Sequence, residues 1–377
     1  MKTYLVTGAA GFIGTNFVKY MLERYSDIDI IVLDKLTYAG KKENLQNEID
    51  DKKITFIQGD IGNYELVRNI FTRYDIDYVV NFAAESHVDR SISSPKVFLE
   101  TNILGTQNLL QVAKEFWQTA TDKKGYPIYK ENKKFIQIST DEVYGSLTKD
   151  YETGIDLILS KELEKVVKDR SDIKTYGKLL FNENTPLNPK SPYSASKASA
   201  DMLVMAYYET YKFPVNITRC SNNYGPYQFP EKLIPLIINN VLEGKKLPVY
   251  GDGSNVRDWL YVKDHNKAVD MVITNGKIGE IYNIGGFNEK SNIDIVKLII
   301  ETIAVLVKDE KYKKALKTDV ANINYDLITY VQDRLGHDKR YAIDPTKIAT
   351  HLGWYPETTF EKGIVETIKW YINEKAL

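Results

Sequence analysis

The sequence predicts an α/β protein with a doubly wound parallel sheet and a smaller C-terminal domain. Short β-branched runs alternate with amphipathic helical patterns over the first 220 residues, an order typical of strands joined by crossover helices. Most predicted strands are apolar at consecutive positions, which indicates that both of their faces are covered. A length of 377 residues also exceeds what one hydrophobic core usually organises. We therefore expect one domain over residues 1–220 and a second mainly over residues 221–377.

The alternating segments can be assigned in chain order. The predicted strands are Thr3–Thr7, Ile28–Leu33, Ile54–Ile57, Tyr78–Asn81, Phe135–Ser139 and Val215–Arg219. The predicted helices are Thr15–Tyr25, Glu65–Tyr74, Pro95–Thr119 and Ser194–Tyr211. Residues 221–377 are less regular and richer in Asn and Pro, which suits a substrate-binding domain with some segments that return to the first domain.

Composition excludes several classes of function. The formal net charge is −1 and no basic stripe with interleaved aromatic residues occurs, so nucleic acid is not an expected partner. No stretch is apolar enough to span a bilayer and no signal-peptide pattern is present, so we expect no membrane partner and a cytoplasmic location. The single cysteine, Cys220, is interpreted as a small buried side chain. The four histidines lack metal-ligand spacing, so no metal is predicted.

The glycine-rich run TGAAGFIG follows the first predicted strand and opens the first helix. Gly8 permits a tight turn, Gly11 lets a pyrophosphate approach the backbone, and Gly14 lets the helix pack closely on the strand. The N–H groups at the start of a helix supply hydrogen-bond donors and positive potential to phosphates. The run therefore predicts a Rossmann-type dinucleotide site.

Acidic residues follow the next two strands. Asp34 ends the second strand, where a carboxylate binds the adenosine ribose hydroxyls and repels the 2′-phosphate of NADP. NAD is therefore the predicted cofactor, although Lys35 beside it would weaken this preference. Asp60, in the run QGDI, is either an adenine contact or a turn aspartate.

Tyr193 and Lys197 form a Tyr-x-x-x-Lys pair that opens a predicted helix, and their spacing places them on one helical face. A free tyrosine has a pKa of about 10. A nearby ammonium stabilises the phenolate and brings the pKa closer to neutrality. The pair therefore predicts a catalytic base, and Lys197 can also hold the nicotinamide ribose.

Thr140, Asp141 and Glu142 follow a predicted central strand in the run STDEVYG. Ligands bind at the carboxyl ends of strands in open α/β sheets, so the Thr140 hydroxyl can bond the oxygen that Tyr193 deprotonates. Two adjacent carboxylic acids are unnecessary for hydride transfer alone, and they predict a general acid and a general base. The alternative is an acidic turn that caps a helix.

A polar, charged excursion lies between Gly145 and Pro192 and contains the helical pattern LILSKELEKVVKDRSD. It is either a solvated surface segment or a flap near the active site, since it connects two predicted catalytic motifs. Both interpretations stay open.

With these motifs the chain resembles the extended short-chain dehydrogenase/reductases, and among them the dTDP-glucose 4,6-dehydratase family. The motifs that carry the resemblance span nearly the whole chain and are TGAAGFIG, VLDKLTYAG, QGDI, AAESHVDRSI, TNILGT, STDEVYG, YSASK, SNNYGPYQFPEKLIPL, YGDG, NVRDWLYVKDH, YNIGG and DRLGHDKRYAID. Related sugar-nucleotide 4-epimerases share the glycine loop and the Tyr-Lys pair, but they lack the Asp-Glu dyad after the threonine.

The resemblance implies a series of chemical steps on dTDP-glucose. Tyr193 removes the proton of the 4-hydroxyl while hydride leaves carbon 4 for NAD. Glu142 then removes the hydrogen on carbon 5, and Asp141 protonates the departing 6-hydroxyl. Hydride returns to carbon 6, which gives dTDP-4-keto-6-deoxyglucose and regenerates NAD.

The resemblance also implies binding residues and a homodimer through helices near Pro95–Thr119 and Ser194–Tyr211. Besides the three glycines, Tyr193 and Lys197, the implied cofactor contacts are Phe12, Ile13, Asp34, Lys35, Leu36, Thr37, Asp60, Ile61, Phe82, Ala83, Ala84, Glu85, Ser86, Thr101 and Asn223. The implied substrate contacts are Ser86, Thr140, Asn222, Lys232, Leu233, Pro248, Val249, Tyr250, Arg257, Asn292, Asp333, Arg334, Leu335, Gly336 and His337. Lys232, Arg257 and Arg334 are the cations available for a diphosphate. Leu335 departs from the family pattern, which has proline there.

Two rival functions stay open. One is a UDP-sugar 4-epimerase or decarboxylase. The other is an NAD-binding sensor that has lost catalysis. The five intact residues of the predicted catalytic set argue against a sensor, because a protein that only binds NAD does not need all of them.

Overall fold

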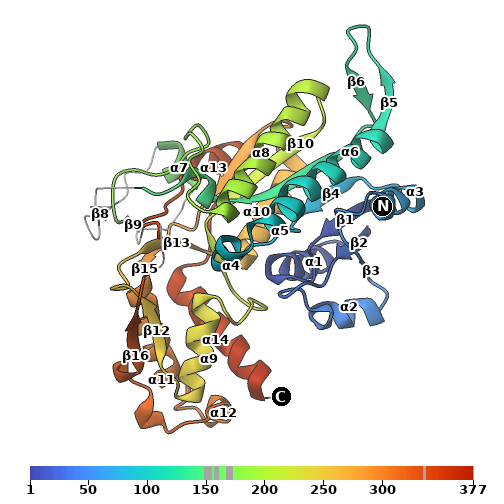
Figure 1. The fold of residues 1–377 in the computed structure, drawn as a ribbon. Helices are drawn as coiled ribbons and strands as arrows, with labels where there is room; N and C mark the ends of the chain where they lie inside the picture. Colours follow the sequence, from blue (N-terminus) through green and yellow to red (C-terminus); the bar gives the residue numbers. More distant parts are fainter. Residues whose placement is uncertain (148–154, 157–160, 167–172, 334–336, 377) are drawn as a thin grey trace.

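The protein is built on a seven-stranded sheet with helices on both faces (Figure 1). The computed structural model describes residues 1–147, 155–156, 161–166, 173–333 and 337–376. The strand order is β14-β10-β7-β4-β1-β2-β3, and all neighbouring strands are parallel. These strands are β1 (Lys2–Thr7), β2 (Ile28–Asp34), β3 (Thr55–Gln58), β4 (Tyr78–Asn81), β7 (Lys134–Thr140), β10 (Val215–Cys220) and β14 (Ile281–Ile284). The predicted doubly wound sheet is confirmed.

Each face of the sheet has its own hydrophobic cluster. The helices of the first face are α1 (Phe12–Arg24) and α10 (Val262–Asn275), and those of the second are α3 (Tyr64–Arg73), α6 (Thr106–Trp117) and α8 (Pro192–Tyr211). Neighbouring residues of β2 point to opposite clusters, since Val32 packs with Phe17 of α1, whereas Ile31 packs with Val67 of α3. Burial on both faces explains why the strands are apolar at consecutive positions.

The predicted helix Pro95–Thr119 is less regular than its sequence pattern suggests. It consists of α5 (Pro95–Phe98), a π-helical turn (Leu99–Gly105) and α6. Within the π turn, the Asn102 side chain accepts a hydrogen bond from the Glu85 N–H at 2.9 Å and donates one to the Glu85 carbonyl at 3.0 Å. These hydrogen bonds with the distant residue Glu85 favour the π-helical turn over a regular α-helical one. The local pattern of apolar residues does not predict these hydrogen bonds. After α6 the chain enters a projecting hairpin of β5 (Gln118–Thr121) and β6 (Pro127–Tyr129) (Figure 1).

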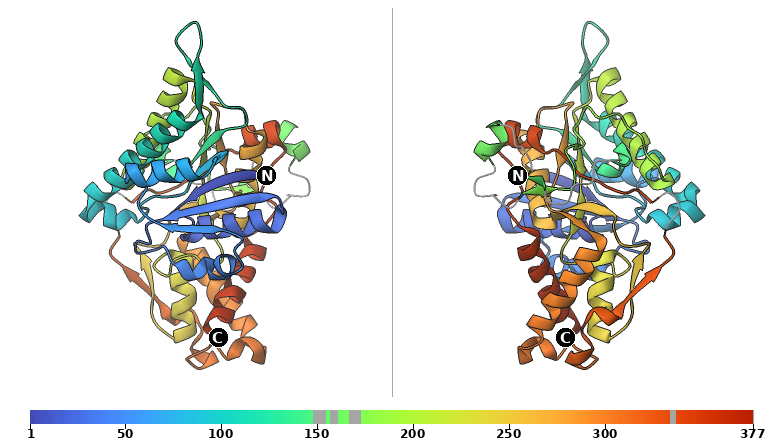
Figure 2. Two further views of the ribbon diagram at one scale, coloured as in Figure 1. Left: turned by 90° about the vertical axis from the view of Figure 1, so that its right-hand side faces the viewer. Right: turned by 90° about the vertical axis from the view of Figure 1, so that its left-hand side faces the viewer.

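A smaller lobe packs below the sheet in the view of Figure 1 and is seen from two further sides in Figure 2. Its helices are α9 (Leu233–Glu243), α11 (Asn292–Leu306), α12 (Glu310–Lys313) and α14 (Phe360–Ala376). Its strands are β11 (Asn222–Tyr224), β12 (Leu247–Tyr250), β13 (Val256–Tyr261), β15 (Glu289–Ser291) and β16 (Ile328–Val331). Ile237, Ile299 and Ile368 lie in its core. Strand β14 is part of the large sheet and α10 packs on it, so the second half of the chain contributes to both parts. The domain boundary at residue 220 stays a prediction.

The described parts of the excursion are residues 146–147, strand β8 (Ile155–Asp156), helix α7 (Lys161–Val166), and residues 173–191, which include strand β9 (Lys174–Thr175), the partner of β8. Helix α7 packs against α13 (Thr346–Leu352). Residues 148–154, 157–160 and 167–172 lie outside the described residues, so the flap hypothesis stays a prediction. In the described part of the chain, no helix combines the length and the apolar character that crossing a bilayer requires.

Candidate active site

A cavity of about 320 Å³ opens where the strands of the large sheet end. Its wall includes Leu33 of β2, Thr140 of β7 and Cys220 of β10. The carboxyl ends of three parallel strands therefore border the same cavity. This edge is where ligands bind in open α/β sheets. Cys220 is buried, as the sequence predicts.

Most of the predicted contacts lie on the wall of this cavity. All five predicted catalytic residues do so, namely Thr140, Asp141, Glu142, Tyr193 and Lys197. The other predicted cofactor contacts on the wall are Gly8, Gly11, Phe12, Ile13, Gly14, Asp34, Lys35, Thr37, Asp60, Ile61, Phe82, Ala83, Ala84, Glu85, Ser86, Thr101 and Asn223. Of the predicted cofactor set, Leu36 does not line it. The predicted substrate contacts on the wall are Ser86, Thr140, Asn222 and Lys232.

The glycine loop has no space for larger side chains. Gly8 has a φ of +67°, and a Cβ there would lie 2.6 Å from the backbone of Ala83. A Cβ on Gly14 would lie 2.6 Å from Ala9 Cα, so α1 packs directly on the loop. The residue before α1 is Gly11, which has no side chain to cap the first N–H groups of the helix. These donors border the cavity and fit a pyrophosphate.

Asp34 supports the same loop from the end of β2. Its carboxylate accepts hydrogen bonds from the Ala10 N–H at 2.9 Å and the Leu36 N–H at 2.8 Å. Burial raises the pKa of Asp34 above its usual value. Lys35 Nζ lies 2.6 Å from Asp60 Oδ2, so the cation beside Asp34 is already paired.

Tyr193 and Lys197 project from the first turns of α8, whose start is stabilised by reciprocal hydrogen bonds between Ser191 and Ser194. Lys197 Nζ donates to the carbonyl of Ile138 at 2.7 Å, and burial lowers the pKa of Lys197. Burial, together with the negative charge of Glu142, raises the pKa of Tyr193 well above its usual value. The sequence suggested that Lys197 lowers the pKa of this phenol. The net shift has the opposite direction: a hydrogen bond with Thr140 lowers the pKa of Tyr193, but burial outweighs it.

The acidic dyad lies on the short helix η3 (Asp141–Tyr144) directly after β7. Thr140 caps this turn, because its Oγ1 accepts a hydrogen bond from the Glu142 N–H at 3.3 Å, and Asp141 and Glu142 lie in the first turn after the cap. Asp141 is buried whereas Glu142 is partly exposed. Burial and the charge of Glu142 raise the pKa of Asp141 well above its usual range. Two neighbouring carboxyl groups in such different environments suit an acid and a base.

A buried network beneath the cavity joins the elements that carry these groups. Arg219 Nε lies 2.8 Å from Asp201 Oδ2, and Ser139 Oγ donates to the same oxygen at 3.0 Å. Arg219 Nη1 donates to Tyr144 Oη at 2.9 Å. The network therefore connects α8, β7, β10 and η3. Sequence reasoning did not find it, because Asp201 and Arg219 belong to none of the quoted motifs.

The remaining predicted substrate contacts lie in the smaller lobe and do not line the cavity. Those described are Leu233, Pro248, Val249, Tyr250, Arg257, Asn292, Asp333 and His337, whereas Arg334, Leu335 and Gly336 lie outside the described residues. Strand β12 pairs with β16, which brings Tyr250 beside Val331, close to Asp333. Arg257 Nη2 donates to the carbonyl of Asp338 at 2.9 Å.

Several residues on the cavity wall are missing from the predicted contacts. They are Leu33, Tyr38, Ala39, Gly40, Gly59, Ile138, Ser139, Cys220, Ser221, Gln228, Phe229 and Glu231. The rings of Tyr38 and Phe229 pack edge to face with their centroids 5.6 Å apart. The Arg90 guanidinium lies 4.1 Å from the centroid of the Tyr38 ring. Tyr38 and Phe229 belong to VLDKLTYAG and SNNYGPYQFPEKLIPL, so reading those motifs to their full length would have found them.

Comparison with known proteins identifies the family of this chain. The model of the NAD dependent epimerase/dehydratase family matches residues 4–285. A dTDP-glucose 4,6-dehydratase from Shigella flexneri is 47% identical over 368 residues, which cover 98% of this chain and 92% of that protein. The chain belongs to the NAD dependent epimerase/dehydratase family.

Two solved structures that are similar to this chain were crystallised with NAD. The dTDP-glucose 4,6-dehydratase from Bacillus anthracis is 44% identical, with a TM-score of 0.78 and coverage of 100% of this chain and 98% of that chain. The enzyme of the same name from Streptomyces venezuelae is 38% identical, with a TM-score of 0.80 and coverage of 99% and 98%. The family assignment therefore extends to the smaller lobe as well as to the sheet.

Proposed function

We propose that the chain is an NAD-dependent dTDP-glucose 4,6-dehydratase, a hydro-lyase that forms dTDP-4-keto-6-deoxyglucose. One observation carries the proposal: Tyr193 and the turn with Thr140, Asp141 and Glu142 share one cavity wall with the glycine loop. The names of the relatives that match nearly the full chain support the same reaction.

The residues present fit the cofactor. The start of α1 would hold the pyrophosphate, and Asp34 would hold the adenosine ribose. Bound NAD would supply a hydride acceptor for carbon 4 and a hydride donor for carbon 6.

The residues of this chain carry the proton transfers. Tyr193 accepts the proton of the 4-hydroxyl, and Thr140 bonds the same oxygen. Glu142, partly exposed to the cavity, removes the hydrogen on carbon 5 once the neighbouring ketone has acidified it, and it returns this proton to carbon 5 when hydride adds to carbon 6. Asp141 gives the proton to the departing 6-hydroxyl, since burial raises the pKa of its carboxyl group well above the usual range and so favours the protonated form.

The test is incubation of the purified protein with dTDP-glucose and with UDP-glucose in separate reactions, followed by mass spectrometry. We expect loss of one water from dTDP-glucose. An epimer of unchanged mass from UDP-glucose would favour the rival epimerase. NAD binding without any sugar conversion would favour the sensor.

We further propose a homodimer formed through α4 (Val88–Ser93), the π turn and α8. These elements pack together, and their exposed apolar side chains include Ile92, Leu99, Leu104 and Met202. The Met202 residue is 58% exposed, which favours burial against a second copy. Met202→Glu should convert the dimer to a monomer in sedimentation, whereas Val305→Glu, at a 63% exposed position of α11, should not. A monomeric parent would contradict the proposal.

For location we propose the cytoplasm. The chain has one cysteine, Cys220, and it is buried, which suits a reducing compartment. Fractionation of the native cells, with antibody detection of the protein, tests this.

A further inference from the structure

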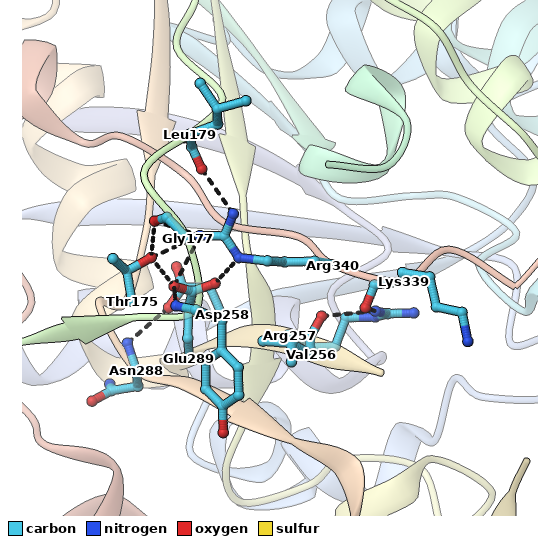
Figure 3. A network of polar contacts seen from close by, with 11 residues as sticks. Thr175, Gly177, Leu179, Val256, Arg257, Asp258, Asn288, Glu289, Lys339 and Arg340 are labelled. Carbon is cyan, nitrogen blue, oxygen red and sulfur yellow. Dashed lines mark hydrogen bonds and ion pairs between the residues drawn. The ribbon is translucent and has the colours of Figure 1, made fainter. Parts of the chain in front are cut away.

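A buried ion pair joins the smaller lobe to the last part of the excursion (Figure 3). Arg340 Nε lies 2.6 Å from Glu289 Oε1, and both side chains are only 4% exposed. The other two nitrogens of Arg340 are also bonded, since Nη1 donates to the Leu179 carbonyl at 2.9 Å and Nη2 to Thr175 Oγ1 at 2.7 Å. The guanidinium is therefore held by β15 on one side and by the excursion on the other.

The excursion completes the surroundings of this pair. Glu289 accepts a hydrogen bond from the Tyr176 N–H at 2.9 Å and a short one from the Thr175 hydroxyl. Burying two charges is costly unless further hydrogen bonds satisfy them. Because these bonds come from residues 175–179, the pair depends on the excursion for its stability.

Arg340 belongs to an extended segment, residues 338–341, that runs beside β13. The Val256 N–H donates to the Lys339 carbonyl at 2.8 Å, and the Tyr341 N–H donates to the Val256 carbonyl at 3.2 Å. From the other side, the Leu147 N–H donates to the Arg340 carbonyl at 3.0 Å. The segment thus lies between β13 and the chain that leaves the acidic turn.

The next side chain, Tyr341, belongs to the opposite face of this segment. It packs in a cluster with Val143 and Tyr144 of η3, the helix that carries Asp141 and Glu142. The Arg257 guanidinium lies 4.3 Å from the centroid of its ring. Residues 338–341 therefore support both the acidic turn and Arg257, while Arg340 itself does not line the cavity.

We propose that Arg340 is a positioning residue: with Glu289 and Thr175 it holds residues 338–341 in place, and through them Arg257, for binding of the nucleotide sugar. The inference rests on the proposed function for the identity of the substrate. It gives residues 173–181 of the excursion a role in substrate affinity.

The main variant is Arg340→Met combined with Glu289→Gln, which removes both charges and leaves neither buried without a partner. We expect the KM for dTDP-glucose and the Kd for dTDP to rise about tenfold to hundredfold, because small misplacements of binding groups have effects of this size. The kcat should change less than the KM, and the Kd for NAD should stay within about twofold of the parent value, since the glycine loop does not contact the pair.

Three further variants sharpen the test. Arg340→Lys keeps the charge and should restore much of the affinity. Thr175→Val removes only the excursion's hydroxyl and should raise the KM by a smaller factor. The matched control is Lys267→Met, which breaks an exposed ion pair, Lys267–Glu357 at 2.6 Å, and should leave both constants unchanged.

An unchanged KM in the folded double variant would overturn the proposal. A rise of the Kd for NAD by the same factor as the KM would also overturn it, since this would indicate general loosening. If the parent does not turn over dTDP-glucose, the proposed function fails, and hydrogen exchange still tests the positioning. Faster exchange confined to the amides of residues 256–258 and 338–341 in the double variant supports it, and unchanged exchange there overturns it.

Discussion

The cavity and the smaller lobe hold their polar side chains in different ways. Around the cavity, Gly8, Asp34 and Thr140 stand at or just beyond the ends of three parallel strands of the same sheet, so one sheet sets their relative positions. In the smaller lobe, Arg257 and Arg340 are held by carbonyl groups and side chains of segments that are distant in sequence. Pairing within one sheet therefore fixes the positions of the first group, whereas hydrogen bonds between separate segments fix the positions of the second. Substitutions in the two regions should therefore separate chemistry and cofactor binding from substrate affinity.

The largest effect is expected from Tyr193→Phe. It removes the base for the first step, so the rate of dehydration should fall about ten-thousandfold, the upper end for a positioned acid–base group. Neither NADH absorbance nor dehydrated sugar should accumulate with dTDP-glucose. NAD binding by calorimetry should persist, because the glycine loop is intact. Rapid NADH formation in this variant would show that another group takes the proton.

The dyad should affect only the second half of the chemistry. Glu142→Gln removes the base for carbon 5 and Asp141→Asn removes the proton donor, so each should slow water loss about a hundredfold to a thousandfold. Both variants should still form NADH with dTDP-glucose, which absorbance measures before mass spectrometry detects dehydrated product. If Glu142→Gln dehydrates the sugar as fast as the parent, the dyad is structural and the dehydratase proposal loses its main support.

Two different kinds of sequence information lie behind the structural features of this chain. The glycine loop, the dyad and the Tyr-Lys pair follow from local motifs, and parallel strands bring their ends together without further information. Other features depend on contacts between segments that are distant in the chain. They are the ion pair Arg219–Asp201, the π turn at Asn102 and the ion pair Arg340–Glu289. No local pattern marks such contacts, so the structure was needed to find them.

Substitution of two glycines with similar backbone conformation compares the crowded cavity wall with a position where a Cβ meets no neighbouring atom. Gly8 and Gly353 both have a positive φ, +67° and +70°, but a Cβ meets the Ala83 backbone only at Gly8. Gly8→Ala should shift the loop at a cost of about 1–3 kcal/mol and weaken NAD binding about tenfold or more. Gly353→Ala should cost only about 1 kcal/mol of stability and leave NAD affinity unchanged. Equal losses of NAD affinity in the two variants would show that the effect does not arise at the loop.

The pH dependence should report the buried acid. Burial and the charge of Glu142 raise the pKa of Asp141 well above its usual range, so its carboxyl group keeps its proton to a higher pH than an ordinary aspartate does and loses it as the pH rises further. Only the protonated form can act as the proposed acid. The dehydration rate should then fall on the alkaline side by up to about tenfold per pH unit. Asp141→Asn has no such proton to lose, and its residual rate should lack that alkaline fall. An identical alkaline limb in the variant would assign it to another group.

The smallest effects separate the two charged residues at the end of β2. Asp34 is buried and bonds two backbone N–H groups through different oxygens, so Asp34→Asn leaves one of them without its acceptor. This should cost about 1–3 kcal/mol and weaken NAD binding about tenfold. It should also narrow the preference for NAD over NADP, because the charge that repels a 2′-phosphate is gone.

Lys35→Met is the matched comparison, since Lys35 is 52% exposed and its ion pair with Asp60 is open to solvent. An exposed pair contributes about 1 kcal/mol at most, so NAD affinity should change by less than about fivefold. Calorimetric titration of the parent and both variants with NAD and NADP gives the six values needed. If Lys35→Met alters the NAD to NADP ratio more than Asp34→Asn does, the exposed pair governs the choice of cofactor. The buried carboxylate would then serve mainly to brace the glycine loop through the Ala10 N–H.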